Sequence, residues 1–295
     1  MKKILGIFSV ILASLYVMAA CGQAQPTADP SAQSQQEGSQ QANATTSDTP
    51  TLDAIRERGY LIVGTFGDRP PFGYVDAAGD IVGLDPYISR RFAYEFFGDY
   101  DAIEFVITEA ANRIAFLQAG HVDLIMATFT ITEDRMEQVH FALPYMRAAL
   151  GVIAPEGSDI QSITDLYGRN LIVTSGTTAE IYFTQNHPQI NLVRFGQNTE
   201  SFAALADGRG DAMSHDNSLL FAHVFANPGF DIIYGSLGEE DYLAPAVNLA
   251  ATDLLQWLND TITTLRAENF FYHAYDVTLR DSFTPDTNPS YIMVN

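Results

Sequence analysis

Lysine is missing from almost the whole of this 295-residue chain, because its only two lysines are Lys2 and Lys3. The remaining residues therefore hold no P-loop lysine, no Schiff-base lysine for pyridoxal phosphate and no lysine-rich nucleic-acid face. Thirteen arginines there stand against 36 acidic residues, a formal charge of −23 that repels phosphate backbones. We expect no nucleic-acid partner, and we expect most of the acids to form a solvated surface.

Cysteine occurs once, at Cys21, which excludes an intramolecular disulfide and a cysteine-rich metal site. The six histidines are scattered without H-E-x-x-H or another ligand-like spacing, and G-x-S-x-G does not occur. The sequence therefore predicts no metal site, no cofactor and no catalytic nucleophile. The enzyme alternative is a hydrolase or lyase, because a dehydratase needs only one carboxylate as acid or base.

The amino-terminal residues resemble a bacterial lipoprotein signal. Lys2 and Lys3 precede an apolar run, residues 4–20, which ends in small residues before Cys21. In such a signal residues 1–20 are removed and Cys21 is acylated. The alternative is an uncleaved anchor helix, for which the run is at the short limit of roughly 17 to 25 spanning residues. In either case we expect the rest of the protein outside the cytoplasm.

Residues 21–50 are rich in Gln, Ala, Ser and Thr and carry almost no large apolar side chain. Such a segment cannot bury enough apolar surface to offset the entropy of ordering. We therefore predict a disordered tether between the anchor and a globular part. The chain as a whole has 47% hydrophobic residues, which is enough for a core in that globular part.

From residue 51 the chain alternates helix-like with strand-like segments, which predicts an α/β fold with mostly parallel sheets. NRIAFLQAG precedes HVDLIMATF in the first half, and FAALADGRG precedes DAMSHD in the second. The spacing L-x-x-G-x-x-D occurs in both places. We therefore predict two similar lobes, lobe 1 from residues 51–148 and 243–295 and lobe 2 from residues 149–242.

The segment VDLIMATF is expected to be a buried strand, and EDRMEQV to begin a helix with Thr132 as its N-cap. Backbone N–H groups at that helix start favour an anion. Arg135 stands on the first turn, and a guanidinium suits bidentate recognition of a carboxylate. Thr128 and Thr130 add hydroxyls on the same side of the strand. The alternative is that Arg135 pairs with neighbouring acids on the surface.

Two junctions in the second half have the same form. LIVTSGTTAE is a strand, a glycine turn and a helix, with Thr177 and Thr178 at the helix start. DAMSHDNSLL is a strand that leads through His215 and Asp216 into another helix. Asp216 has two interpretations: an N-cap of that helix, or a carboxylate that accepts from an ammonium group.

The stretches NRIAFLQAGHVDLIMATFTITEDR, LIVTSGTTAE and GRGDAMSHDNSLL, in this order, resemble the extracytoplasmic amino-acid-binding proteins of ABC importers, solute-binding family 3. The resemblance runs from about Leu52 to about Arg266. It implies a type II periplasmic-binding-protein fold, with two Rossmann-like lobes joined by a two-strand hinge that closes on a bound amino acid as a Venus flytrap.

The resemblance also implies roles for particular residues. The arginine that grips the α-carboxylate in this family matches Arg135, and its hydroxyl-bearing partners match Thr128, Thr130 and Thr178. The aspartate that grips the α-ammonium matches Asp216. Because these residues lie on different lobes, full contact with the ligand requires closure, and the ligand favours the closed state by differential affinity.

The ligand side chain is harder to predict. Many relatives place an aromatic ring where this chain has Arg69, in the segment GTFGDRPPFGYVD. Arg69 would neutralise an acidic ligand, or would be a loop arginine in solvent. Phe66 is a further candidate for the pocket. His215 stands where some glutamine-binding relatives carry a histidine, so glutamine stays open, but we favour glutamate or aspartate.

The resemblance finally implies partners and location. We expect a lipid-anchored monomer on the extracytoplasmic side of the membrane, which delivers an amino acid to an ABC transporter permease and ATPase. The alternatives are a lyase or dehydratase on the same fold, and a ligand-sensing subunit that signals through a separate membrane protein.

Overall fold

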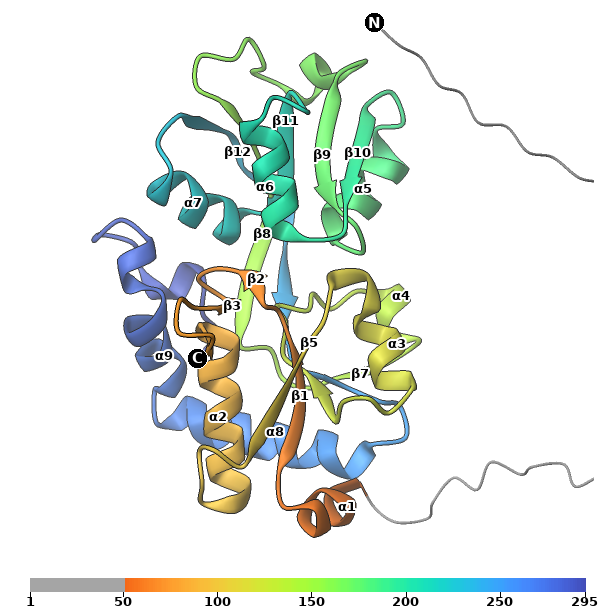
Figure 1. Ribbon diagram of the computed structural model, residues 1–295, viewed down its shortest axis with the longest axis vertical. Coiled ribbons are helices and arrows are strands. Elements are labelled where there is room, and N and C mark those ends of the chain that lie inside the picture. The colour runs from red at the N-terminus through yellow and green to blue at the C-terminus, as the bar shows by residue number, and fades with distance from the viewer. Residues whose placement is uncertain (1–50) are drawn as a thin grey trace, which may run out of the picture. The chain divides into compact units, whose positions relative to one another are not determined.

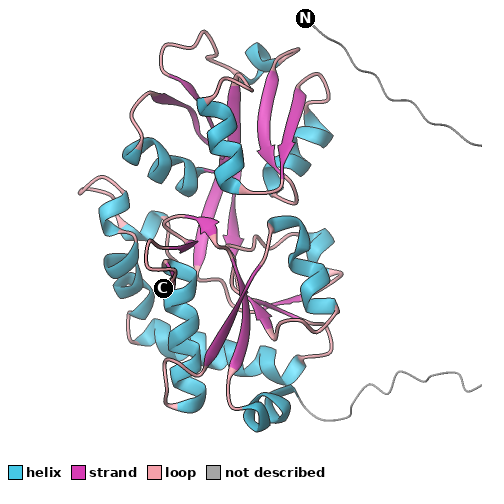
Figure 2. Ribbon diagram, viewed as in Figure 1, coloured by secondary structure: helices cyan, strands magenta, loops and turns pink. Residues whose placement is uncertain are grey.

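A computed structural model of the chain describes residues 51–295, in which two sheets each carry helices (Figures 1 and 2). The predicted fold class, two α/β lobes joined by two hinge strands, is confirmed. Cys21, the predicted signal (1–20) and the predicted tether (21–50) lie outside the described residues. Within residues 51–295, no helix is long and apolar enough to cross a membrane.

Lobe 1 is built on a five-stranded sheet in the order β5-β1-β6-β13-β7. β1 runs parallel to β5 and β6, and β13 pairs antiparallel with β6 and β7 although it follows lobe 2 in the sequence. The short strands β2, β3 and β4 form a separate sheet. The elements of lobe 1 are α1 (Thr51–Arg58), β1 (Leu61–Thr65), β2 (Asp68–Arg69), β3 (Gly73–Val75), β4 (Ile81–Val82), α2 (Leu84–Phe97), β5 (Ile103–Ile107), η1 (Ala110–Asn112), α3 (Arg113–Gln118), β6 (Leu124–Ile125), α4 (Glu133–Met136), β7 (His140–Phe141), β13 (Ala246–Val247), α8 (Thr252–Ala267), α9 (Phe270–Thr278), η3 (Arg280–Ser282) and η4 (Pro289–Tyr291).

Lobe 2 has a second five-stranded sheet in the order β10-β9-β11-β8-β12. β9 lies parallel to β10 and β11, whereas β8 runs antiparallel to its neighbours β11 and β12. The elements of lobe 2 are β8 (Met146–Pro155), η2 (Ile163–Leu166), β9 (Asn170–Thr174), α5 (Thr178–Asn186), β10 (Asn191–Phe195), α6 (Asn198–Ala206), β11 (Ala212–Asp216), α7 (Asn217–Ala226) and β12 (Phe230–Leu243).

The two long strands β8 and β12 connect the lobes (Figure 1). They pair from Met146 opposite Leu243 onward, with register shifts along their length. The predicted lobe boundaries, at residues 148 and 243, fall within these two strands and stay a prediction.

Helix α2 illustrates how the sequence pattern builds lobe 1. Leu84, Ile88 and Phe92 recur every four residues and are fully buried in the lobe 1 core. Burial of side chains of this kind stabilises a fold by roughly 1.5 to 3 kcal/mol each. The helix ends at Gly98, whose φ of +75° favours glycine because an L side chain is strained there. This packing fixes the first turn of α2, which carries the buried Asp85.

The carboxy-terminal helices α8 and α9 pack in the core that contains α2 of lobe 1. Their apolar residues, including Leu254, Leu258, Ile262, Phe271 and Tyr275, belong to the same core as α2. No structure was predicted for the tail after Phe283. In the structure it returns to the hinge, where Met293 forms a bridge with Met146.

The predicted strand VDLIMATF is shorter than expected, and this corrects the sequence analysis. β6 ends at Ile125, and Thr128 has a φ of +37°, which no strand allows. The N–H of Thr128 donates to Asp85 Oδ2 at 2.8 Å, and this contact holds the turn. Thr128 and Thr130 therefore do not lie on one face of a strand, although both reach the same pocket.

Candidate functional site

One pocket between the lobes gathers the arginines, threonines and aspartate that the sequence analysis selected for ligand binding. Its lining consists of Arg69, Arg113, Thr128, Thr130 and Arg135 from lobe 1, and Thr177, Thr178, His215 and Asp216 from lobe 2. Arg113 is an addition that sequence reasoning missed. Phe66 does not line the pocket but lies fully buried in the core beside β1.

Arg69 and Asp216 form an ion pair across the pocket, from β2 in lobe 1 to the end of β11 in lobe 2. Both are almost fully buried, so the interpretation of Arg69 as a solvent-exposed loop residue is wrong. Asp216 stands at the N-cap position of α7, as the alternative predicted, but its side chain makes no capping hydrogen bond and pairs with Arg69. Burial alone would raise the pKa of the Asp216 carboxyl, but its neighbours, Arg69 foremost, together outweigh burial and hold that pKa below its ordinary value.

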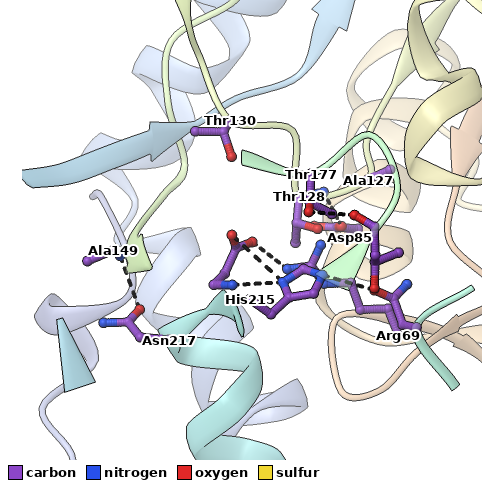
Figure 3. Close-up of polar contacts among 12 residues, drawn as sticks. Arg69, Asp85, Ala127, Thr128, Thr130, Ala149, Thr177, His215 and Asn217 are labelled. Carbon is purple, nitrogen blue, oxygen red and sulfur yellow. Dashed lines mark hydrogen bonds and ion pairs between the residues drawn. The ribbon is translucent and has the colours of Figure 1, made fainter. Parts of the chain in front are cut away.

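His215 is fully buried beside this pair, with both ring nitrogens in hydrogen bonds (Figure 3). Nδ1 accepts from the backbone N–H of Asp216 at 2.7 Å, so Nε2 carries the proton and donates to Asn198 Oδ1 at 3.1 Å. Burial, with Arg69 adding to it, lowers the pKa of His215 to about 3. The ring is therefore neutral at physiological pH and has no free nitrogen for a ligand.

Arg135 lies on the short helix α4, whose start was predicted correctly: Thr132 is the N-cap, and its Oγ1 accepts from the N–H of Arg135 at 3.3 Å. The guanidinium is buried and turns into the cleft, where it donates to Thr130 O at 2.7 Å and to Gly176 O at 3.0 Å. The alternative of a surface pair with neighbouring acids is therefore wrong. Burial lowers the pKa of Arg135 to about 10, although Asp216 acts in the opposite direction.

Arg113 is the third guanidinium of the pocket and is 2% exposed. It stands at the start of α3, where the sequence NRIAFLQAG gives no sign that this arginine points inward. Burial, followed by the charges of Arg135 and Arg69, holds its pKa well below the ordinary value. Three guanidinium groups therefore crowd a buried space.

Asp85 is fully buried and does not line the pocket. It lies beside Thr128 (Figure 3). Its carboxylate accepts from Tyr145 Oη at 2.6 Å and from the N–H of Thr128 at 2.8 Å. Burial raises the pKa of Asp85 to about 6, although both hydrogen bonds act against it. Asp85 therefore shapes the turn at Thr128, and sequence reasoning missed it because its partners are distant in the chain.

Two polar atoms of the pocket are buried without a hydrogen-bond partner among residues 51–295: Thr128 Oγ1 and Arg69 Nε. Buried polar groups normally have partners, since leaving one unpaired costs roughly 1 to 3 kcal/mol. On the lobe 2 side, Thr177 caps α5 and donates to Thr174 O at 2.6 Å, so its hydroxyl is engaged within the lobe. The half-buried Thr178 is the other threonine of the pocket at the amino end of α5.

The arrangement can hold an anion. The pocket lining carries three guanidinium groups and one carboxylate, and a buried charge without a counter-charge is costly. An anionic group placed against Arg135 would reduce the repulsion among the guanidinium groups. It would also lie within reach of the threonine hydroxyls and the amino end of α5.

Comparison with known proteins gives consistent results. Residues 61–276 match the family described as bacterial extracellular solute-binding proteins, family 3. The structure resembles the cysteine-binding protein from Campylobacter jejuni, with a TM-score of 0.83 and 46% identity over 84% of this chain and 100% of that one. It also resembles the solute receptor for L-cysteine of Neisseria gonorrhoeae, with a TM-score of 0.81 and 44% identity over 83% and 99% of the two chains.

A curated relative extends the comparison over more of the sequence. The ABC transporter glutamine-binding protein GlnH of Bacillus subtilis is 27% identical over 277 residues, which cover 93% of this chain and 96% of the relative. The resemblance that the sequence analysis found is thereby confirmed.

Proposed function

This chain belongs to the bacterial extracellular solute-binding proteins of family 3, and we propose from this premise that it captures one amino acid between its lobes and delivers it to an ABC importer. The observation that carries the proposal is the excess of buried guanidinium groups over carboxylates in the pocket. The name of the B. subtilis relative supports the importer as partner. The protein acts as a monomer, and it needs no cofactor.

The amino acid is held as a zwitterion. Its α-carboxylate lies against Arg135, whose remaining N–H groups can form charge-assisted hydrogen bonds, each contributing roughly 1.5 to 3 kcal/mol. The hydroxyls of Thr128, Thr130 and Thr178 surround that carboxylate. The ammonium group of the ligand lies against the carboxylate of Asp216 and displaces Arg69 from Asp216, wholly or in part.

The displaced Arg69 then faces the side chain of the ligand. A buried guanidinium that has left its carboxylate needs a new acceptor. L-Cysteine is the first candidate, because the C. jejuni protein named for cysteine is 46% identical to this chain. Its thiol, which loses its proton to solvent more readily beside a guanidinium, then supplies the missing negative charge as a thiolate. Glutamate and aspartate are the second candidates on the same charge argument. Glutamine is less favoured, because its amide carries no charge and both nitrogens of His215 are already engaged.

The site binds and does not catalyse. A dehydratase would need an acid or base that can reach its substrate. His215 is held neutral, Asp216 binds the ammonium group of the ligand, and Asp85 does not line the pocket and is engaged by Tyr145 and Thr128. These contacts leave none of the three in the position of a general base.

Cys21 anchors the protein to the outer face of the cell membrane through an attached lipid, and residues 21–50 act as the tether. The support is the sequence of the first 21 residues alone. Growth of expressing cells with a labelled fatty acid tests the anchor: label should enter the wild-type protein and be absent from Cys21→Ser. Equal labelling of both would contradict acylation at this residue.

The binding function is tested by a thermal-shift screen of the protein against the twenty amino acids, with citrate and simple sugars as controls. A ligand that binds only the folded state raises stability by mass action, so a tight ligand stands out by several degrees. We expect the shift to be confined to cysteine or to the acidic amino acids. A screen without any amino-acid shift would contradict the proposal and favour the sensor or lyase alternatives.

A further inference from the structure

Arg113 is surrounded by backbone carbonyl oxygens. Its Nε donates to Ala110 O at 3.0 Å and its Nη1 to Ala127 O at 3.0 Å, both within lobe 1. Its Nη2 crosses the cleft and donates to Gly176 O in lobe 2 at 3.1 Å. A guanidinium has five N–H donors, so most of those of Arg113 are directed at backbone and not at the interior of the pocket.

The carbonyl of Gly176 accepts a second hydrogen bond from lobe 1. Arg135 Nη2 donates to it at 3.0 Å, while Arg135 Nη1 donates to Thr130 O at 2.7 Å. A carbonyl oxygen has two lone pairs, so both are used. Hydrogen bonds from charged donors are stronger than neutral ones, especially in a buried site. Two guanidinium groups of lobe 1 therefore hold one point of the lobe 2 backbone.

Gly176 leaves no room for a side chain at this contact. Its φ is +78°, and an added Cβ would lie 2.5 Å from the N and Cα atoms of Ala111 and 2.8 Å from the carbonyl carbon of Ala110. These atoms are backbone of η1 and cannot rotate aside as a flexible side chain can. Lobe 2 can approach lobe 1 this closely only with glycine at position 176.

We propose that the carbonyl of Gly176 and the guanidinium groups of Arg113 and Arg135 form a latch that holds the two lobes closed. Arg113 acts in closure and does not hold the ligand, whereas Arg135 serves both the latch and the α-carboxylate. Because one guanidinium has both tasks, a ligand that orients Arg135 also prepares the latch. The contact of Arg135 with the α-carboxylate rests on the proposed function, but the latch itself does not.

The variant that tests the latch is Gly176→Ala, which places a Cβ against η1 in the closed state only. A positive φ strains alanine in any state, so Gly168→Ala is the matched control: its φ is +79°, and no heavy atom lies within 4 Å of an added Cβ. Gly196→Ala controls for a methyl group at the cleft, where the nearest atom is Glu109 Oε2 at an ordinary contact distance of 3.6 Å.

Spin labels at the exposed positions Glu137→Cys and Asn186→Cys, in the full chain with Cys21→Ser, report the distance between the lobes by double electron–electron resonance. Each variant is measured alone and with L-cysteine, L-glutamate, L-aspartate or L-glutamine. We expect a population of molecules with the short distance of closed lobes in the wild type and in both controls. We expect this closed population to be lost in Gly176→Ala. The affinity for the amino acid that binds should fall about thirtyfold, or roughly 2 kcal/mol.

Arg113→Lys is the second variant, because it keeps the positive charge but one ammonium group cannot reach all the carbonyl oxygens. We expect it to reduce the closed population. Closure of Gly176→Ala to the wild-type extent would overturn the latch, as would the absence of any closed population in the wild type. If no amino acid binds the wild type, the proposed function fails, while the closed population without ligand still tests the latch.

Discussion

Arg69 and Asp216 pair inside the pocket between the lobes and join the two lobes there. Asp216, which we assign to the ligand's ammonium group, therefore already has a cationic partner within the protein. Removing one partner of a buried pair costs roughly 3 to 5 kcal/mol, because the other charge is left without compensation. A ligand that separates the pair must supply both charges, which is what a zwitterion with an acceptor side chain can do.

Arg135→Ala should weaken binding of the amino acid at least a hundredfold, by roughly 3 kcal/mol, because the α-carboxylate loses its charged donor. Calorimetric titration of the wild type and the variant measures the change. Arg56→Ala is the control, since Arg56 is exposed and its ion pair with Asp53 lies on the surface. Near-native affinity in Arg135→Ala would contradict the assigned role.

Asp216→Ala should also weaken binding at least a hundredfold, by roughly 3 kcal/mol, because the ammonium group loses its carboxylate. The exposed Asp207, in the same lobe, provides the matched control Asp207→Ala. The same titration decides the outcome, and an affinity within threefold of the wild type would remove Asp216 from the clamp.

Arg69→Gln should reduce the affinity for cysteine, glutamate or aspartate about tenfold more than the affinity for glutamine, a difference of roughly 1.4 kcal/mol. The reason is that this substitution keeps a polar side chain at position 69 but removes the positive charge that a negatively charged ligand side chain requires. Competition titrations of the variant with the four amino acids measure this selectivity. Equal losses for all four would leave Arg69 without a selective role.

Asp85 should make the stability of the fold depend on pH. Its pKa rises from 3.8 to about 6 on folding, so the folded state binds the proton more tightly than the unfolded chain. This contribution is fully present below about pH 4 and is lost as the pH rises through 6. The free energy of unfolding of the wild type, relative to Asp85→Asn, should therefore fall by about 3 kcal/mol over that range. Urea unfolding of both proteins at each pH tests this, and parallel pH profiles would contradict it.

The parts of the site that the sequence predicted correctly depend on local chemistry. The N-cap at Thr132 and the helix start that carries Arg135 depend on residues within three positions of one another. The glycine turn and cap before Thr178 are equally local. Propensity and spacing are therefore enough to place these groups.

The parts that the sequence did not predict depend on contacts between distant segments. Arg69 meets Asp216 from 147 residues away, Arg113 meets Gly176 from 63, and Thr128 meets Asp85 from 43. The last contact ends the predicted strand early by holding a left-handed turn, which no local pattern indicates. Burial also turns Arg113 inward from a helix whose sequence is compatible with exposure.

The most direct test of the central claim, that the lobes clamp a zwitterion between Arg135 and Asp216, is calorimetric titration with one amino acid in three forms. The free amino acid found in the thermal-shift screen is compared with its N-acetyl derivative and with its α-carboxamide. We predict that the free form binds and that each blocked form loses at least a hundredfold in affinity, or roughly 3 kcal/mol. Binding of either blocked form as tightly as the free amino acid would contradict the clamp.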